Sequence, residues 1–402
     1  MARVNIVVPR LHRHTFTGGI LCIFEYAKGL HQRGHEVSVV PLLPSPYPRW
    51  VNGSFGRLQL RPVRQPVDQE APRASVAGRQ GLISAVRNLA ATGGVHVARY
   101  FPREVQRGFQ LYFVRERLPP ADVTVATSFE TALPVHLFGM GRRCYFMQHF
   151  EPLFAVDSPN PEWLRHEALA SYRLGLHMIA NSRWLRDTVR EQTGIEPQLC
   201  PNAIDHSIFR LDARAKPSSG EIHIISYGGG AASWKGFREM AGAVRDVRSA
   251  MRGNRIKWSV FGPCLLPPRN DIADYEPLGF LRPEELARAY CSSDILLSAS
   301  WYESFPLFPL EAMACGLAVI TTQPGTEEFA LHGRTAEIVQ PRDVNSIAAG
   351  LRRLIDDAEY RCRLADNGRL EAQRFSWTHA VDRMEKLLLE PDPTDAVGVK
   401  SG

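Results

Sequence analysis

The stretch Ser300–Gly316 reads SWYESFPLFPLEAMACG and is the most informative part of the sequence. Glu303 and Glu311 lie eight positions apart, and the residues between them are apolar except for Ser304. We expect Glu303 on a loop after a strand and Glu311 at the opening of a helix. A carboxylate in apolar surroundings is costly unless it is paired or binds a ligand, and the vicinal hydroxyls of a sugar or ribose suit it. The alternative is two acids that the dipole of a helix N-terminus favours.

On both sides of this stretch, short apolar runs alternate with helical periodicity. Strands are predicted at 4–8 and 37–40, with a helix at 20–33 between them, and the alternation begins again with a strand at 222–227 and a helix at 237–251. Two such starts predict two α/β domains with parallel sheets, which bind ligands at the carboxyl ends of their strands. The other predicted strands are 123–126, 145–147, 178–180, 198–200, 256–261, 295–297 and 318–321. The other predicted helices are 81–117, 163–174, 182–191, 283–290, 310–315, 344–355 and 360–373.

The totals fit a globular protein of two domains. The chain has 402 residues, of which 44% are hydrophobic and 22% charged. The seven cysteines are widely spaced and form no Cys-x-x-Cys pair, so we expect neither a disulfide framework nor a zinc site, and a cytoplasmic location. The first apolar run is cut by Pro9, and no run approaches the ~18 residues of a membrane span. No Asp-x-Asp triplet or His/carboxylate cluster with ligand spacing occurs, so no metal is expected.

The segment Arg61–Arg117 is unusually basic. It contains ten arginines and no lysine against four acids, a local excess of six positive charges within a chain of net charge +6. This excess predicts an anionic partner such as a membrane surface or lipid phosphate, and so a chain that is membrane-associated from the side. A solvated helical face explains it equally well. Nucleic acid is not expected, because the segment lacks a helix-turn-helix, zinc or aromatic-platform signature.

The stretch Ser300–Gly316 resembles the Glu-x7-Glu signature of the family-4 retaining glycosyltransferases of the GT-B fold. Five further stretches resemble other elements of that family and follow in the family's order: Thr17–Ile20, Ile179–Ser182, Pro201–Asp205, Trp234–Gly236 and Arg374–Trp377. The resemblance therefore runs over nearly the whole chain.

This resemblance implies two Rossmann-like, doubly wound parallel-sheet domains that face each other across a cleft. Residues 1–205 would form an N-terminal acceptor-binding domain, and residues 206–375 a C-terminal domain that binds the nucleotide-sugar donor. Residues 376–390 would form a helix that crosses back to the first domain, and residues 391–402 a tail.

The resemblance also implies roles in donor binding. Glu311 would bind the ribose hydroxyls, Glu303 the hydroxyls of the transferred sugar, and Lys235 the diphosphate as a point charge. The other predicted donor-binding residues are Gly18 and Gly19, which allow close backbone approach, Gly229 and Gly230, the N–H groups of Ser304, Phe305, Leu307 and Phe308, and Phe280 in a loop near the base. One departure is plain, because the family's diphosphate-binding arginine is replaced here by Gly229 or Gly230.

A histidine close to the reacting sugar is implied by the segment Tyr145–Pro152. His149 is the expected catalytic residue beside Glu303 and Lys235, and Gln148 is the runner-up. The local pattern Gln-x-x-Glu-Pro also resembles a rhamnosyltransferase-like branch of the family. On the acceptor side we expect Gln148, Ser128, Glu130 and His14.

The function implied is transfer of a sugar, of hexosyl type, from a nucleoside-diphosphate sugar to an acceptor hydroxyl, with retention, without metal and without any other cofactor. The acceptor is a lipid-linked or cell-envelope glycan, as in polysaccharide biosynthesis, or a small natural product. Three alternatives stay open: a nucleotide-sugar epimerase, a glycogen-type phosphorylase, and a catalytically degenerate nucleotide-binding or scaffold protein.

Overall fold

The computed structural model describes residues 1–13, 17–51, 55–60, 103–212, 220–229, 232–251, 256–263 and 273–390, and these form two sheets. The first has the strand order β3-β2-β1-β4-β5-β6-β7 and the second β10-β9-β8-β11-β12-β13. The first sheet consists of β1 (Arg3–Val8), β2 (Glu36–Pro41), β3 (Arg57–Leu58), β4 (Val123–Ala126), β5 (Arg142–Met147), β6 (His177–Ala180) and β7 (Gln198–Leu199). The second consists of β8 (Ile222–Tyr227), β9 (Ile256–Phe261), β10 (Glu276–Gly279), β11 (Ile295–Leu297), β12 (Ala318–Thr321) and β13 (Glu337–Ile338).

The helices begin where the sequence offers a suitable first residue. The hydroxyl of Ser182 accepts a hydrogen bond from the N–H of Leu185 at 3.1 Å, as an N-cap should, and Pro283 is the first residue of its helix. The α-helices are α1 (Gly18–Gln32), α4 (Arg103–Arg115), α5 (Phe129–Phe138), α6 (Pro161–Ser171), α7 (Arg183–Thr193), α8 (Phe237–Ala250), α9 (Pro283–Cys291), α10 (Leu307–Ala314), α11 (Val344–Asp356), α12 (Ala358–Ala372) and α13 (Trp377–Leu389). Two 3-10 turns are η1 (Glu151–Asp157) and η2 (Ser233–Lys235).

The chain divides into two compact units. The first contains residues 1–147 and 166–179 and the chain from Met384, and the second contains residues 148–165 and 180–383. In the first unit, Glu385 near the end of α13 pairs with Arg33 at 2.6 Å and with His35 at 2.8 Å, next to the end of α1. The prediction of two Rossmann-like parallel-sheet domains is confirmed. The boundaries at 205 and 375 and the cleft stay predictions.

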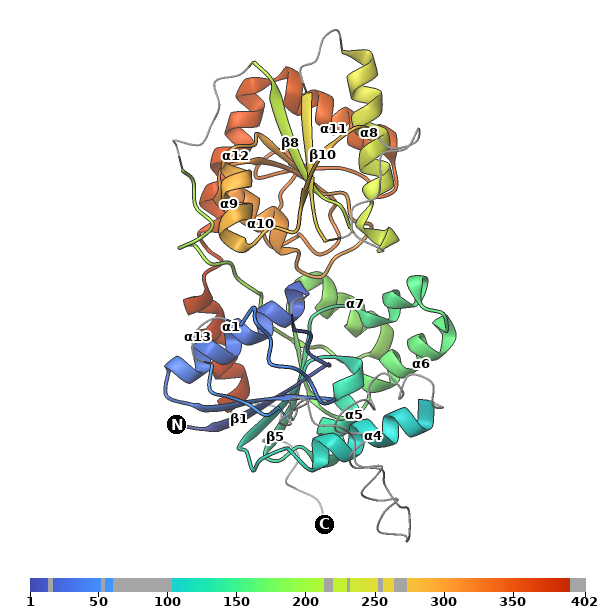
Figure 1. The fold of residues 1–402 in the computed structure, drawn as a ribbon, viewed down its shortest axis with the longest axis vertical. Helices are drawn as coiled ribbons and strands as arrows, with labels where there is room; N and C mark the ends of the chain where they lie inside the picture. The colour runs from blue at the N-terminus through green and yellow to red at the C-terminus, as the bar shows by residue number, and fades with distance from the viewer. Residues whose placement is uncertain are drawn as a thin grey trace, which may run out of the picture. The chain divides into compact units, whose positions relative to one another are not determined.

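The second sheet is buried on both faces, which explains its apolar strands. Ile224 and Leu297 point into one core with α8 and α11, whereas their neighbours Ile225 and Leu296 point into the other core with α9 and α10. Figure 1 shows these helices on either side of β8 and β10. Because successive side chains of a strand face opposite ways, each short strand contributes to both cores.

Each sheet has one point at which the strand order reverses. From β8 the chain runs outward through β9 and β10, then returns to β11 on the other side of β8. In the first sheet the same reversal lies between β1 and β4, which pair with each other in parallel. Loops that leave the carboxyl ends of these neighbouring strands diverge, and open α/β sheets bind ligands there.

The sequence prediction was wrong at several elements. Glu311 does not open its helix, because α10 begins at Leu307 and includes Pro309, which the first turn tolerates. Helix α5 was missed; it contains Pro134 and has little amphipathic pattern. The edge strands β10 and β13 were also missed, because a polar pair such as Glu276-Pro277 gives no strand signal. Residues 81–102 of the predicted helix 81–117 lie outside the described residues, and the remainder contains α4.

Two glycines with positive φ test how tightly the turns of the first unit are packed. A Cβ at Gly141 (φ +64°) would lie 2.0 Å from the carbonyl oxygen of Asp122, whereas one at Gly34 (φ +87°) would meet nothing within 4 Å. We expect Gly34→Ala to lower the free energy of unfolding by about 1 kcal/mol, the cost of the left-handed backbone. Gly141→Ala should cost roughly 1–3 kcal/mol more, because the backbone of Asp122 must move. Equal losses in denaturant unfolding would contradict this packing.

Candidate active site

An ion pair lies at the reversal point of the second sheet. Lys235 belongs to η2, which follows β8, and Glu303 lies on the loop that follows β11. The Lys235 Nζ donates to Glu303 Oε1 at 2.6 Å, and the hydroxyl of Ser300 donates to the same oxygen at 2.8 Å. Both charged side chains are largely shielded from solvent, with 21% of Lys235 and 12% of Glu303 exposed. Two residues that the sequence singled out separately are thus brought into direct contact.

Backbone packing fixes the positions of these two side chains. A Cβ at Gly236 (φ +70°) would lie 2.0 Å from the carbonyl oxygen of Ala299, so η2 packs closely against the loop after β11. The N–H of Trp301 donates to the carbonyl of Trp234 at 2.7 Å. A Cβ at Gly325 would lie 2.2 Å from the carbonyl oxygen of Glu303, so the loop after β12 packs closely on the other side. Glycine is required at both positions because no side chain fits.

Glu311 is a buried carboxyl group on α10. Its side chain is almost inaccessible, and its Oε2 has no hydrogen-bond partner among the described residues. Burial raises the pKa of Glu311 to about 8, so the group is mostly protonated at neutral pH. The fully buried Tyr290 hydroxyl on α9 likewise has no hydrogen-bond partner in the described part of the chain, and burial together with the charge of Glu311 raises its pKa. Unsatisfied polar atoms in a core are rare, and these are the atoms that a ligand would satisfy.

His149 lies within a ring of aromatic side chains. Its centroid is 4.6 Å from Phe154, 5.6 Å from Trp234 and 5.7 Å from Tyr302. Burial lowers the pKa of His149 to about 4, so the imidazole is neutral at physiological pH. Its Nδ1 lies 3.2 Å from the carbonyl of Phe150 and must carry the proton, because a carbonyl only accepts. Its Nε2 is therefore a buried acceptor, and it has no partner in the part of the chain that the structure describes.

Ser304 and Gln148 belong to a polar network around Asn181. The Ser304 hydroxyl donates to Asn181 Oδ1, so the Ser182 hydroxyl, 3.3 Å away, is the donor to Ser304. The Asn181 amide donates to the carbonyl of Gln148 at 3.2 Å, and Asn202 donates to Gln148 Oε1 at 3.2 Å. The side chains of Ser304 and Gln148 thus hold the loops together.

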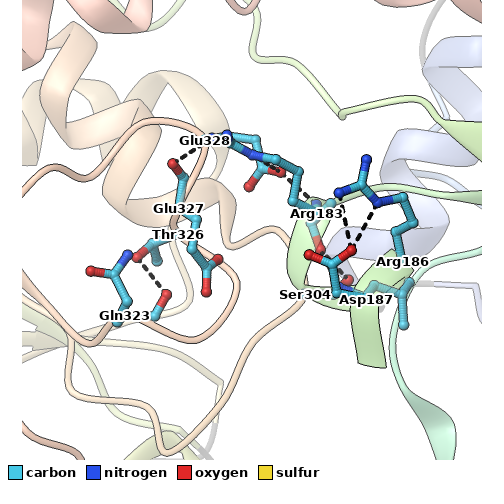
Figure 2. Close-up of polar contacts among 10 residues, drawn as sticks. Arg183, Arg186, Asp187, Ser304, Gln323, Thr326, Glu327 and Glu328 are labelled. Atoms are coloured by element: carbon cyan, nitrogen blue, oxygen red, sulfur yellow. Dashed lines mark hydrogen bonds and ion pairs between the residues drawn. The ribbon is translucent and has the colours of Figure 1, made fainter. Parts of the chain in front are cut away.

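The start of α7 is attached to the loop after β12. Figure 2 shows Arg183, whose N–H donates to Glu328 Oε1 at 2.5 Å and whose guanidinium donates to the carbonyl of Glu327 at 2.8 Å. Because Ser182 precedes Arg183, this attachment also fixes Ser182 beside Ser304.

The remaining predicted donor residues of the second unit have mixed surroundings. Phe305 is buried against Phe329 and Phe375, so its side chain belongs to the core. Leu307 and Phe308 form the first turn of α10, whose N–H groups have no acceptor within the helix. Phe280 follows β10 with 53% of its surface exposed.

The structure gives a steric reason why Gly229 is not the arginine that the family has at this position. Gly229 has φ +74°, and a Cβ there would lie 2.9 Å from the Cβ of Lys235. An arginine at this position would be strained and would displace the lysine. Gly230 and His14 lie outside the described residues. Arg282 does not replace the missing arginine in this structure, because it pairs with Glu285 at 2.8 Å and is largely exposed.

Residues 222–357 match the model of the family described as Glycosyl transferases group 1. This stretch of the chain belongs to that family. The O-antigen biosynthesis protein RfbC of Myxococcus xanthus is 30% identical over 278 residues, which are 68% of this chain and 21% of that protein. The MMP alpha-(1->4)-mannosyltransferase of Mycolicibacterium hassiacum is 39% identical over 100 residues, 24% of each protein. The chain thus spans only about a fifth to a quarter of the length of these curated relatives.

Solved structures show that the chain has the GT-B fold. The sucrose-phosphate synthase of Thermosynechococcus elongatus superposes with a TM-score of 0.69 at 17% identity, over 96% of this chain and 98% of that one. HepE of Anabaena in complex with UDP-glucose superposes with a TM-score of 0.64 at 14% identity, over 96% and 99%. These relatives give no support to the rhamnosyltransferase-like branch.

Other site predictions lie in the first unit of the chain. Gly18 and Gly19 open α1, whose N-cap Thr17 accepts a hydrogen bond from Ile20 at 3.3 Å. Ser128 precedes α5, and its buried hydroxyl has no partner among the described residues, while Glu130 is exposed in the first turn. Their roles toward donor and acceptor stay predictions.

The described residues contain no group of three or more His, Cys, Asp or Glu side chains that could hold a metal ion. Within the same residues, no helix combines the length and apolar character needed to cross a bilayer. Most of the basic segment Arg61–Arg117 lies outside the residues that the structure describes. Binding of this segment to an anionic partner therefore stays a prediction.

Sequence reasoning missed the residues that support the site. Ser300 hydrogen-bonds Glu303, Tyr290 lies near Glu311, and Phe154, Trp234 and Tyr302 enclose His149. Trp234 stood in a recognised motif, but no local signal connects it with Tyr302, 68 positions away in the sequence.

The buried carboxyl of Glu311 predicts a pH-dependent stability. A pKa of about 8 in the folded state lies above the ordinary value, so the folded chain binds the extra proton and loses stability as pH rises toward 8. The slope is at most about 1.4 kcal/mol per pH unit. Glu311→Gln should therefore become more stable relative to the wild type between pH 5 and 8 and level off above that.

The measurement is the free energy of unfolding without nucleotide from pH 5 to 8.5. Exposed Glu359 in the first turn of α12 offers a control, because Glu359→Gln should follow the wild-type curve. A Glu311→Gln curve parallel to the wild type would refute a buried, protonated Glu311.

Proposed function

We propose that this chain transfers a hexosyl group from a nucleoside-diphosphate sugar to a hydroxyl group of a cell-envelope glycan or its lipid-linked precursor, with retention. One observation carries the proposal. The Lys235–Glu303 pair and the unsatisfied carboxyl of Glu311 lie after β8 and β11, where a doubly wound sheet binds nucleotides. The site thus offers a cation for phosphate and two carboxyl groups for hydroxyls.

Each polar group has a matching part of the donor. Lys235 retains N–H donors beyond the one used by Glu303, and these bind the diphosphate. Glu303 and the neutral Nε2 of His149 accept from hydroxyls of the transferred sugar. Glu311 and Tyr290 exchange hydrogen bonds with the ribose diol, because a protonated carboxyl can both donate and accept.

In the proposed reaction, the protein forms no covalent bond with the substrates. The bond between the anomeric carbon and the diphosphate oxygen breaks, and the acceptor oxygen bonds to that carbon from the same face. The acceptor proton passes to an oxygen of the departing diphosphate, so no protein nucleophile takes part. Lys235 stabilises the charge on the leaving group, and Glu303 holds the sugar in position.

Support for the acceptor class comes from the relatives. RfbC, which matches 68% of this chain, is described as an O-antigen biosynthesis protein, and a mannosyltransferase matches a shorter part. A glycan acceptor fits both names. A peripheral contact of Arg61–Arg117 with an anionic membrane would suit a lipid-linked acceptor.

Donor binding is tested by thermal shift with UDP, GDP, dTDP, ADP and CMP. One diphosphate should stabilise the wild type, by about 2.7 kcal/mol at a hundredfold excess over its dissociation constant. The variant Glu311→Ala should bind it about tenfold more weakly, because it loses two hydrogen bonds of a neutral carboxyl group, which contribute about 0.5–1.5 kcal/mol each. If no nucleotide shifts the wild type, the chain is a scaffold and not a transferase.

Steady-state kinetics should distinguish the role of Glu303 from that of Glu311. We expect Glu303→Ala to lower kcat by about 100-fold or more with a modest change in the donor KM, because its contact with the sugar strengthens in the transition state. Glu311→Ala should mainly raise the donor KM. Steady-state kinetics with the identified donor measure both, and equal effects on both parameters in the two variants would contradict these roles. Conversion of the donor without any acceptor would instead indicate an epimerase.

A further inference from the structure

Trp234 contacts the cation of the proposed diphosphate site. The Lys235 Nζ lies 4.1 Å from the centroid of the Trp234 ring, within the range of a cation–π interaction. The same ammonium donates to Glu303 at 2.6 Å. An ammonium has three N–H donors, so contact with a ring face and one carboxylate leaves donors free for a ligand.

The indole ring is itself held firmly. It stacks on Tyr302 with a centroid separation of 5.4 Å and an interplanar angle of 11°. Tyr302 is anchored because its hydroxyl donates to the carbonyl of Leu153 at 3.2 Å. The rings of His149 and Phe154 also pack near the indole, with centroids 5.6 Å and 6.5 Å from that of Trp234. The ring therefore provides a fixed surface for a flexible lysine.

The base of the lysine side chain is confined by Gly229. Gly229 packs so closely that a Cβ there would approach the Lys235 Cβ to 2.9 Å, and its Cγ to 3.5 Å. The glycine leaves room for the lysine stem but supplies no charge. A lysine loses more freedom per hydrogen bond formed than the preorganised fork of an arginine, so a site without arginine benefits from another means of positioning.

We infer that Trp234 is a positioning residue for Lys235, whose ammonium it holds where the diphosphate of the donor binds. The inference rests on the proposed function. It adds Trp234 to the residues that recognise the phosphates, because Trp234 fixes the position of the charged Lys235. Its removal should weaken binding of a nucleoside diphosphate more than that of the corresponding monophosphate.

The test compares diphosphate and monophosphate affinity in the full chain by calorimetric titration, using UDP and UMP, GDP and GMP, dTDP and dTMP, and ADP and AMP. Trp234→Leu should reduce the preference for the diphosphate by about fivefold to tenfold, the range of a partly desolvated cation–π contact. Trp234→Phe retains a ring and should recover most of the preference. If the leucine variant does not fold, the phenylalanine variant still tests the inference through a smaller loss of the same preference.

A double-mutant cycle shows whether the effect passes through the lysine. In the Lys235→Met background, Trp234→Leu should cause no further loss of diphosphate preference. Trp301 provides a matched control, because its ring carries a different cation, Arg342, at 3.8 Å. Trp301→Leu should leave the preference unchanged.

The outcomes separate the two proposals. If the wild type binds a diphosphate and Lys235→Met abolishes the preference, while Trp234→Leu leaves it intact, Trp234 is not a positioning residue and the proposed function stands. An equal effect of Trp234→Leu with and without Lys235 would also overturn the inference. Absence of nucleotide binding by the wild type would overturn both proposals.

Discussion

The ion pair between Lys235 and Glu303 is the constraint on which the rest of the site depends. Two opposite charges with little exposure to solvent tolerate that environment only while they compensate each other, and removing one partner of such a pair is strongly destabilising. The loops that carry them must therefore meet closely. Gly236 and Gly325 permit this approach on the two sides of the loop after β11, where any Cβ would collide with a carbonyl oxygen.

Much of the fold was predictable because the strands are buried on both faces. Runs such as Ile222–Tyr227 and Ala318–Thr321 are apolar or nearly so, and their lengths match the observed strands β8 and β12. The edges were not predictable in the same way. Strand β10 includes exposed Glu276 and Pro277, and β13 has only two residues. Neither segment therefore shows the apolar run or alternation by which a strand is recognised in a sequence. Helix α5 was missed because Pro134 interrupts its sequence.

The candidate site was predictable as a set of residue types but not as a set of contacts. The spacing of Glu303 and Glu311 indicated their importance, yet it gave no sign that one is paired and the other has an unsatisfied oxygen. That difference arises from long-range partners, since Lys235 lies on the neighbouring loop and α10 turns Glu311 into the core. Likewise the bond between Ser304 and Asn181 joins residues 123 positions apart.

Under the proposed function, the charges of the described site also explain why a glycine can stand in place of the family's arginine. At neutral pH, Lys235 and Glu303 cancel, and Glu311 is mostly protonated because burial raises its pKa to about 8. His149 is neutral because burial lowers its pKa to about 4. These four groups therefore present no net negative charge to an incoming diphosphate, whereas an ionised Glu311 would repel it. A single lysine can then suffice, provided that its ammonium is held in place, and Trp234 meets that requirement without adding charge.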